Sequence, residues 1–255
     1  MRAVCDFRVV DESADWIVVD KPAPLVVHPA SGRFDDPTLL SGLQQLLAYD
    51  LANGSGLSIL TRLDRETSGL VLVAKNRAAA AHLSRQLQRR EVDKEYLAVV
   101  HGWPEWDVRQ ESGSIIRAGE VGESEIWLRQ RVHSEGRECA TRFRVERRFE
   151  NGRGRFSVLR CFPETGRMHQ IRVHLEEVGH PIVGDKIYGH DGWAYLERVA
   201  GRISEGTEDR LMLPRHALHA ALLAADWNGV RIEWRSELPK DLARFVEGGR
   251  VKRGS

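Results

Sequence analysis

A charged stretch between two apolar runs constrains this chain more than any other segment. Thr61–Gly69 reads TRLDRETSG, and the apolar runs Leu57–Leu60 and Leu70–Ala74 flank it. Apolar runs of this kind predict strands, and a loop that joins strands is held rigidly enough to carry chemistry. Asp64 lies between two arginines, which keep a carboxylate ionised and suit it to act as a nucleophile. A solvated surface turn fits the same pattern, so both interpretations stay open here.

Composition predicts a globular protein with a proper core. The chain has 255 residues, of which 42% are hydrophobic and 29% charged, so it can form one large domain or two small ones. No apolar run is long enough to span a bilayer, and the N-terminus lacks the apolar region of a signal peptide. Cys5, Cys139 and Cys161 are scattered and odd in number, which predicts no disulfide framework and a cytoplasmic location.

The charge balance gives only a weak indication of a partner. Net charge is +1, so composition alone does not identify a nucleic-acid-binding protein. Basic residues do gather locally, and such groups fit phosphate contacts and solvated helix faces equally well. The two groups are Arg85, Arg89, Arg90 and Lys94, and Arg160, Arg167 and Arg172.

The order of periodic segments predicts a mixed α/β (α+β) fold with a largely antiparallel central sheet and flanking helices. No internal repeat, low-complexity segment or linker interrupts the chain. Consecutive strand candidates lie close enough in sequence to pair antiparallel. Strands are expected at 15–20, 70–74, 94–100, 125–128, 141–145, 155–159 and 219–227, and helices at 37–47, 77–90, 167–178 and from Pro239.

The helix expected at 167–178 has an apolar stripe with an arginine at its edge. Helical spacing puts Arg172 beside the stripe, where a half-buried guanidinium is costly unless an anion meets it. Asp64 is the obvious candidate for that anion. The stripe consists of Met168, Ile171, Leu175 and Val178.

The histidines near this helix do not predict a metal site. His169 and His174 are five residues apart and therefore on different helix faces, and His180 lies beyond the helix. Each is expected to be an ordinary hydrogen-bonding side chain. Tyr96, in the strand that follows Lys94, is either a core aromatic or a flat surface for a nucleobase.

Several segments together resemble the RluA family of pseudouridine synthases. The most diagnostic is Arg62–Gly69, and the others follow in the family's order from about residue 10 to about residue 240. The supporting segments are Val18–Pro22, Lys94–Tyr96, Gly166–His174, Gly179–Asp185 and Leu218–Ala220.

The resemblance implies a fold and a set of site residues. It implies the pseudouridine synthase catalytic fold with an active-site cleft across the sheet, as a single catalytic domain over residues 1–255 without an N-terminal S4 domain. It places the catalytic aspartate at Asp64, a loop-ordering arginine at Arg62 and a base-stacking tyrosine at Tyr96. Arg172 would be the basic partner of the aspartate, and Ile182 would line the pocket.

The implied activity is isomerisation of uridine to pseudouridine in transfer RNA, ribosomal RNA or both. It requires no metal or redox cofactor, and the resemblance implies a protein that binds RNA. Nothing in the sequence requires more than a monomer, and no membrane partner is expected. The aspartate could attack C1′, add to C6 or take the 2′ proton, and the residues do not choose among these routes. The family usually has a histidine where this chain has Thr61, which puts an RNA contact at that position in doubt.

Two other functions fit parts of the pattern. A uracil-releasing N-glycoside hydrolase would need a second carboxylate, for which Glu66 is the candidate, and would produce free uracil. A non-catalytic RNA-binding protein would bind uridine-containing RNA without changing it. Retention of Asp64, Tyr96 and Arg172 together argues against the non-catalytic protein, and the position of Glu66 only two residues from Asp64 is a weak basis for the hydrolase.

Overall fold

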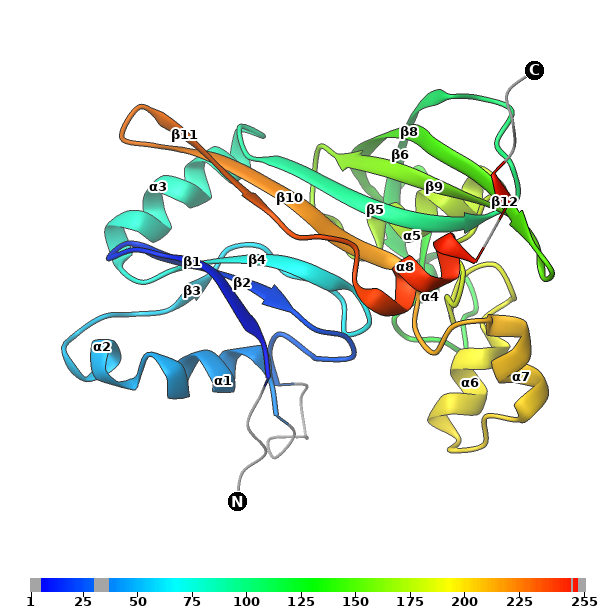
Figure 1. The fold of residues 1–255 in the computed structure, drawn as a ribbon, viewed down its shortest axis with the longest axis horizontal. Coiled ribbons are helices and arrows are strands. Elements are labelled where there is room, and N and C mark those ends of the chain that lie inside the picture. The colour runs from blue at the N-terminus through cyan, green and yellow to red at the C-terminus, as the bar shows by residue number, and fades with distance from the viewer. Residues whose placement is uncertain (1–5, 30–36, 249, 252–255) are drawn as a thin grey trace. The chain divides into compact units, whose positions relative to one another are not determined.

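The computed structural model describes residues 6–29, 37–248 and 250–251 and divides the chain into two compact units (Figure 1). The first unit consists of residues 1–94 and 220–237, and the second of residues 95–219 and 238–255. Strand β10 belongs to both, because its first two residues lie in the second unit and the rest in the first.

The first unit is a small sheet with the strand order β1-β2-β4-β10-β11, and β3 also pairs with β4. The pairs β1–β2, β2–β4, β3–β4 and β10–β11 are antiparallel. The strands are β1 (Arg8–Glu12), β2 (Trp16–Lys21), β3 (Ser58–Ile59), β4 (Ser68–Ala74), β10 (Leu218–Trp227) and β11 (Val230–Arg235).

Helices cover this sheet and explain why β2 and β4 are apolar at nearly every position. Leu83 of α3 packs on the core cluster that holds Trp16 and Leu70, and Figure 1 shows α1 and α2 on the opposite side of the strands from α3. Thr38 caps α1, with its side chain accepting the Ser41 N–H in a capping box. The helices are α1 (Leu39–Leu46), α2 (Ala48–Ala52) and α3 (Arg77–Gln88).

The second unit is a longer sheet with the strand order β5-β9-β8-β6-β7, and β12 pairs with β8. The pairs β5–β9, β8–β9, β6–β8, β6–β7 and β12–β8 are antiparallel. The strands are β5 (Asp93–His101), β6 (Val108–Arg117), β7 (Gln130–Val132), β8 (Arg137–Asn151), β9 (Gly154–Pro163) and β12 (Arg250–Val251).

Helix α5 packs its buried side chains on this sheet, in a core that includes Phe143 and Leu159. Helix α8 contributes Leu242 and Val246 to the same core. The helices are α4 (Ala118–Val121), α5 (Gln170–Glu177), α6 (Trp193–Val199), α7 (Glu205–Leu211) and α8 (Lys240–Glu247).

The predicted mixed fold and its largely antiparallel pairing are confirmed, with two local corrections. The strand expected at 125–128 is wrong: Ile126–Arg129 forms a turn closed by an N–H···O bond of 3.0 Å between its end residues. Helix α5 begins at Gln170 rather than at 167, because His169 adopts a left-handed backbone with φ of 57°. Met168 therefore lies outside the helix and is 49% exposed instead of joining the apolar stripe.

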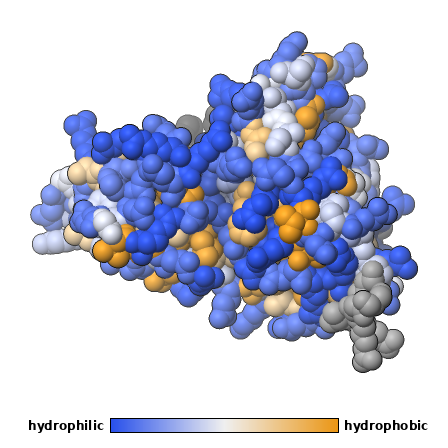
Figure 2. Space-filling view, turned by 90° about the horizontal axis from the view of Figure 1, so that it is seen from above, coloured by the Kyte–Doolittle hydropathy of each residue, from blue (hydrophilic) through white to orange (hydrophobic). Residues whose placement is uncertain are grey.

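The surface is mainly polar. Figure 2 shows hydrophilic residues over most of the visible face, with small scattered hydrophobic groups. Within the described residues, no helix combines the length and the apolar character that crossing a membrane requires.

Candidate active site

Asp64 sits at the start of a tight turn between β3 and β4. The Thr67 N–H donates to the Asp64 carbonyl at 3.1 Å, which closes a four-residue turn with Arg65 and Glu66 at its centre. The Asp64 side chain is partly buried, whereas Arg62 is exposed. The turn thus presents the carboxylate from a fixed backbone, as the sequence predicted for this loop.

A buried lysine holds this turn from inside the first unit. Lys21 is fully buried, and its ammonium donates to the carbonyls of Pro22 at 3.0 Å, Leu25 at 2.8 Å and Arg65 at 3.3 Å. The Arg65 carbonyl also accepts the Leu25 N–H at 2.9 Å. A buried ammonium is tolerated only when its donors are satisfied, so Lys21 ties the turn to the end of β2.

Gly69 permits close packing directly after the turn. Its φ of +111° is a conformation that side chains disfavour, and a Cβ there would lie 2.2 Å from the Ala220 carbonyl oxygen. Only glycine lets the backbone of β4 approach β10 this closely, so Gly69 fixes where the turn ends.

The position that departs from the family pattern has an internal role. Thr61 is buried, and its hydroxyl accepts the Leu72 N–H at 2.9 Å, which continues the pairing of β3 with β4. The hydroxyl thus replaces a backbone acceptor in the ladder. This contact explains why a small hydrogen-bonding side chain fits at residue 61.

Tyr96 lies in the second unit, on β5 opposite Cys161 of β9. Its ring is partly buried and packs against the core of that unit. The ring of Tyr96 is therefore partly a core aromatic, and its predicted stacking role stays a prediction.

Lys94, two residues earlier and in the first unit, has an altered pKa. Burial and the charge of Arg90 lower the pKa of Lys94 to about 8.

Arg172 forms a buried bidentate ion pair that the sequence reasoning missed. Its Nε donates to Oδ2 of Asp185 at 2.7 Å and its Nη2 to Oδ1 at 2.9 Å, and both residues are at least 95% buried. The guanidinium also lies over the Tyr188 ring at 4.9 Å. Asp185 is thus an anion that meets Arg172, and the expected pairing of Arg172 with Asp64 stays a prediction.

Asp185 is itself held in one orientation. Its Oδ1 accepts the N–H groups of Ile187 at 2.9 Å and Tyr188 at 3.2 Å. Burial alone would raise the pKa of Asp185, but the charge and hydrogen bonds of Arg172 outweigh burial and hold the pKa well below its usual range. The residue falls at the end of the Gly179–Asp185 segment that supported the resemblance, so its signal was present but its role was not assigned.

The three histidines near α5 are hydrogen-bonded, as expected. His174 Nδ1 lies 3.0 Å from the Thr141 hydroxyl, His169 Nδ1 lies 2.8 Å from the Tyr188 hydroxyl, and His180 Nδ1 lies 2.9 Å from the His101 carbonyl. Within the described ranges, no three His, Cys, Asp or Glu side chains are grouped to hold a metal ion.

Ile182 is 2% exposed and belongs to the core of the second unit, where its backbone bridges to Val100. The structure thus places Asp64 at the start of the turn and Arg62 two residues before it, both in the first unit, and Tyr96, Arg172 and Ile182 in the second unit. A common pocket that brings the two groups together stays a prediction.

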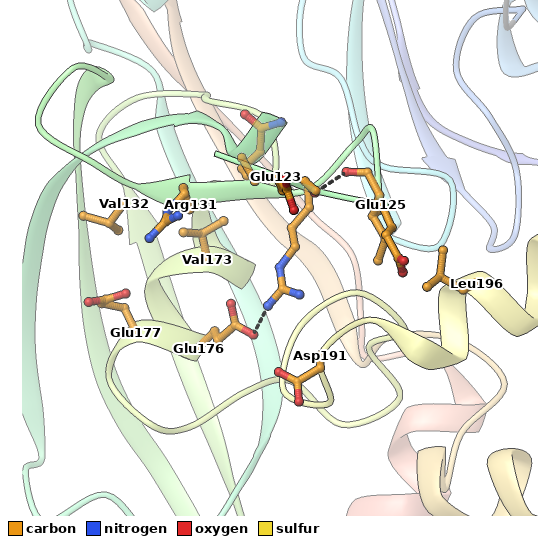
Figure 3. A pocket seen from close by; sticks show the side chains of 14 residues that line it. Glu123, Glu125, Arg131, Val132, Val173, Glu176, Glu177, Asp191 and Leu196 are labelled. Carbon is orange, nitrogen blue, oxygen red and sulfur yellow. Dashed lines mark hydrogen bonds and ion pairs between the residues drawn. The ribbon is translucent and has the colours of Figure 1, made fainter. Parts of the chain in front are cut away.

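The second unit also contains an acidic cavity of about 540 Å³. Figure 3 shows Glu176 in it, with Glu123, Glu125 and Asp191 around. Glu176 forms an ion pair of 3.3 Å with Arg129, which also lines the cavity. Burial raises the pKa of Glu176. Such a lining repels phosphate, so this cavity does not suit an RNA backbone.

Comparison with known proteins identifies relatives over nearly the whole chain. Residues 15–177 match the family described as RNA pseudouridylate synthase. The chain is 36% identical over 244 residues to the ribosomal large subunit pseudouridine synthase D of Nitrosomonas europaea, a match that takes in 94% of this chain and 64% of that protein. The protein of that name from Pseudomonas aeruginosa is 38% identical over 239 residues, covering 92% of this chain and 69% of the relative.

Solved structures show the same fold. Human RNA pseudouridylate synthase domain containing 1 is similar with a TM-score of 0.67 and 27% identity, over 96% of this chain and 95% of that one. Human RNA pseudouridylate synthase domain containing 4 has a TM-score of 0.73 at 20% identity, a likeness of fold.

Proposed function

Since this chain belongs to the RNA pseudouridylate synthase family, we propose that it isomerises uridine to pseudouridine in RNA and that Asp64 is its catalytic group. The observation that carries the proposal is the turn itself. A partly buried carboxylate begins a turn whose next residue is anchored by the fully buried Lys21. A reacting group needs this kind of fixed backbone, because misplacement of about 1 Å can cost a hundred-fold in rate.

The reaction requires an ionised carboxylate and a uridine outside its stack. The N1–C1′ bond breaks, the C5–C1′ bond forms, C5 loses its proton and N1 gains one, so the atoms balance without a redox partner. The enzyme must meet an unstacking cost of a few kcal/mol. Tyr96 would stack on the extruded base and recover part of that cost.

Arg172 would keep Asp64 charged while Asp185 orients the guanidinium. Asp185 engages the Nε and Nη2 side of Arg172. This contact fixes the plane of the group, and the remaining Nη1 edge is the one proposed to meet Asp64. Arg62 would order the turn, and Ile182 would support the wall of the pocket.

Large-subunit ribosomal RNA is the substrate that we propose. The relatives from Nitrosomonas europaea and Pseudomonas aeruginosa are named for the ribosomal large subunit, and the chain spans 64% and 69% of their lengths. Transfer RNA is the second candidate, to be assayed in parallel. We further propose that the protein acts in the cytoplasm as a monomer, and that its two units form one catalytic domain. Size-exclusion chromatography with light scattering tests the oligomeric state.

Replacement of Asp64 tests the catalytic assignment. Unmodified large-subunit ribosomal RNA is incubated with the wild type or with Asp64→Ala, digested with nuclease and analysed for pseudouridine. The wild type should form pseudouridine, and the variant should form none while still binding the transcript. Full activity of Asp64→Ala would refute the assignment.

The same digests separate isomerisation from hydrolysis. Glu66→Ala removes the second carboxylate that a hydrolase would need, and it should leave pseudouridine formation intact. Free uracil in the wild-type reaction, lost in Glu66→Ala, would establish the hydrolase instead.

A further inference from the structure

A second cavity of the second unit, of about 440 Å³, has an exposed tryptophan on its rim. Trp127 is 71% exposed, at the second position of the Ile126–Arg129 turn. An indole this open to water is unusual on a surface that is otherwise mainly polar. The polar residues of its lining include Arg117, Glu120, Gln130, Glu135, Arg137 and Arg167.

One face of the tryptophan is already stacked. The guanidinium of Arg117 lies 3.6 Å from the centre of the Trp127 ring, and its Nη2 forms an ion pair of 3.1 Å with Glu120. The Arg117 Nε is buried, and among the described residues it has no hydrogen-bond partner. This packing holds the indole in place. A ligand that stacks on the other face of the ring therefore does not meet the entropic cost of ordering the side chain.

Two further arginines line the same cavity without a carboxylate partner among the described residues. Arg137 and Arg167 are both exposed, and Arg167 donates from its Nε to the Glu138 carbonyl at 3.4 Å. Unpaired guanidiniums beside an aromatic face are the combination that holds single-stranded nucleic acid, with the ring for a base and the charges for phosphates.

The neighbouring acidic cavity limits where an RNA strand can run. The two cavities share Gln130 in their linings, but Glu123, Glu125 and Glu177 line only the acidic one (Figure 3). Carboxylates outnumber arginines in the acidic cavity, which repels phosphate, whereas the lining of the second cavity has three arginines against the two carboxylates of Glu120 and Glu135. This contrast in charge favours an RNA strand that lies along the second cavity rather than along the acidic one.

We propose that the Trp127–Arg117 pair is a stacking platform for an unpaired base of the substrate RNA, and that Arg137 and Arg167 hold the adjoining phosphates. The inference rests on the proposed function for the identity of the RNA. The platform is proposed for a nucleotide other than the reacting uridine, because the proposed function already assigns the stacking of that uridine to Tyr96.

Equilibrium binding to a single-stranded oligouridylate tests the platform directly. Trp127→Ala should weaken binding about ten- to a hundred-fold, the range for loss of one base stack, while Trp127→Phe retains an aromatic face and most of the affinity. Tyr49→Ala is the matched control, because Tyr49 is 82% exposed and belongs to the first unit. Unfolding curves establish that each variant folds.

Salt dependence tests the arginines separately. Arg137→Gln combined with Arg167→Gln should reduce the slope of log K against log salt concentration by about 1.4, because two phosphate contacts to a single strand are lost. The pair Arg198→Gln and Arg202→Gln removes the same charge from exposed positions of the second unit and should leave the slope unchanged.

Activity on the ribosomal transcript distinguishes this inference from the proposed function. Trp127→Ala should raise KM and leave kcat unchanged at saturating RNA. A wild type that binds RNA without forming pseudouridine would overturn the proposed function alone. Wild-type affinity in Trp127→Ala together with an unchanged salt slope in the arginine variant would overturn the platform. Trp127-dependent binding of a polyglutamate peptide, with RNA binding unaffected, would also overturn it and assign the surface to an acidic protein.

Discussion

Arg172 and Asp185 form a fully buried fork-to-fork ion pair, with N–O distances of 2.7 and 2.9 Å. Both side chains are at least 95% buried. Water therefore cannot take the place of either partner when the other is removed. The pair joins α5 to the segment after Ile182, and it fixes the plane of the arginine that we place opposite Asp64 in the proposed mechanism. If Arg172 acts as proposed, stability and activity depend on the same contact.

Asp185→Asn should lower the free energy of unfolding by about 3–5 kcal/mol, because it leaves the buried guanidinium without its counter-charge. Urea denaturation followed by circular dichroism measures the change. Asp107→Asn is the control, since Asp107 is 82% exposed in its ion pair with Arg148 and should cost about 1 kcal/mol or less. Equal effects of the two variants would contradict the role assigned to Asp185.

Lys21→Met should lower the free energy of unfolding by about 1–3 kcal/mol and reduce pseudouridine formation per folded molecule, because the Arg65 carbonyl loses its anchor. Lys75→Met is matched to it: Lys75 is also buried in the first unit, but it pairs with Glu12 at 2.8 Å. The control should lose stability and keep its activity. If both variants lose activity in proportion to stability, Lys21 does not position the turn.

Gly69→Ala should destabilise the protein by more than about 1 kcal/mol, because the new Cβ would meet the Ala220 backbone at 2.2 Å in a positive-φ conformation. Gly56→Ala has nothing within 4 Å of the added Cβ and should be close to neutral. Thermal unfolding of the two variants gives the comparison. A neutral Gly69→Ala would show that β4 does not approach β10 as described.

His101 should make folding sensitive to mild acid. Burial and the nearby His190 lower the pKa of His101 to about 4, so the unfolded chain binds more protons than the folded one between that pH and about 6.5. Stability should therefore rise as pH increases through this window. His101→Asn should flatten the slope, and His28→Asn, which removes an exposed histidine, is the control for the same substitution at the surface. An unchanged slope in His101→Asn would exclude His101 as the source.

Much of the fold was predictable because its signals are local. The ends of β2, α3 and β10 fall close to the predicted ones, since apolar periodicity and a capping residue such as Asn76 define them. The strand β11 was not among the expected ones, although a local signal was present: the hairpin β10–β11 turns at Asn228–Gly229, where both residues have positive φ, as an Asn-Gly pair favours.

The misses have physical causes that extend beyond local pattern. The Gln170 side chain accepts from the Thr165 hydroxyl at 2.6 Å and from the Arg167 N–H at 3.0 Å, which holds the segment before α5 in a turn. The helices α6 and α7 have seven residues each, too few for a clear periodic signal. Among the site residues, Asp185 escaped notice because nothing in the spacing tells which carboxylate meets a buried arginine.

Release of tritium from RNA labelled at C5 of uridine, measured together with pseudouridine, tests the central claim most directly, because transfer of the glycosidic bond to C5 expels that atom. The wild type should release it in proportion to pseudouridine formed, and Asp64→Asn should bind the same RNA and release none. Release by Asp64→Asn at the wild-type rate would contradict the account.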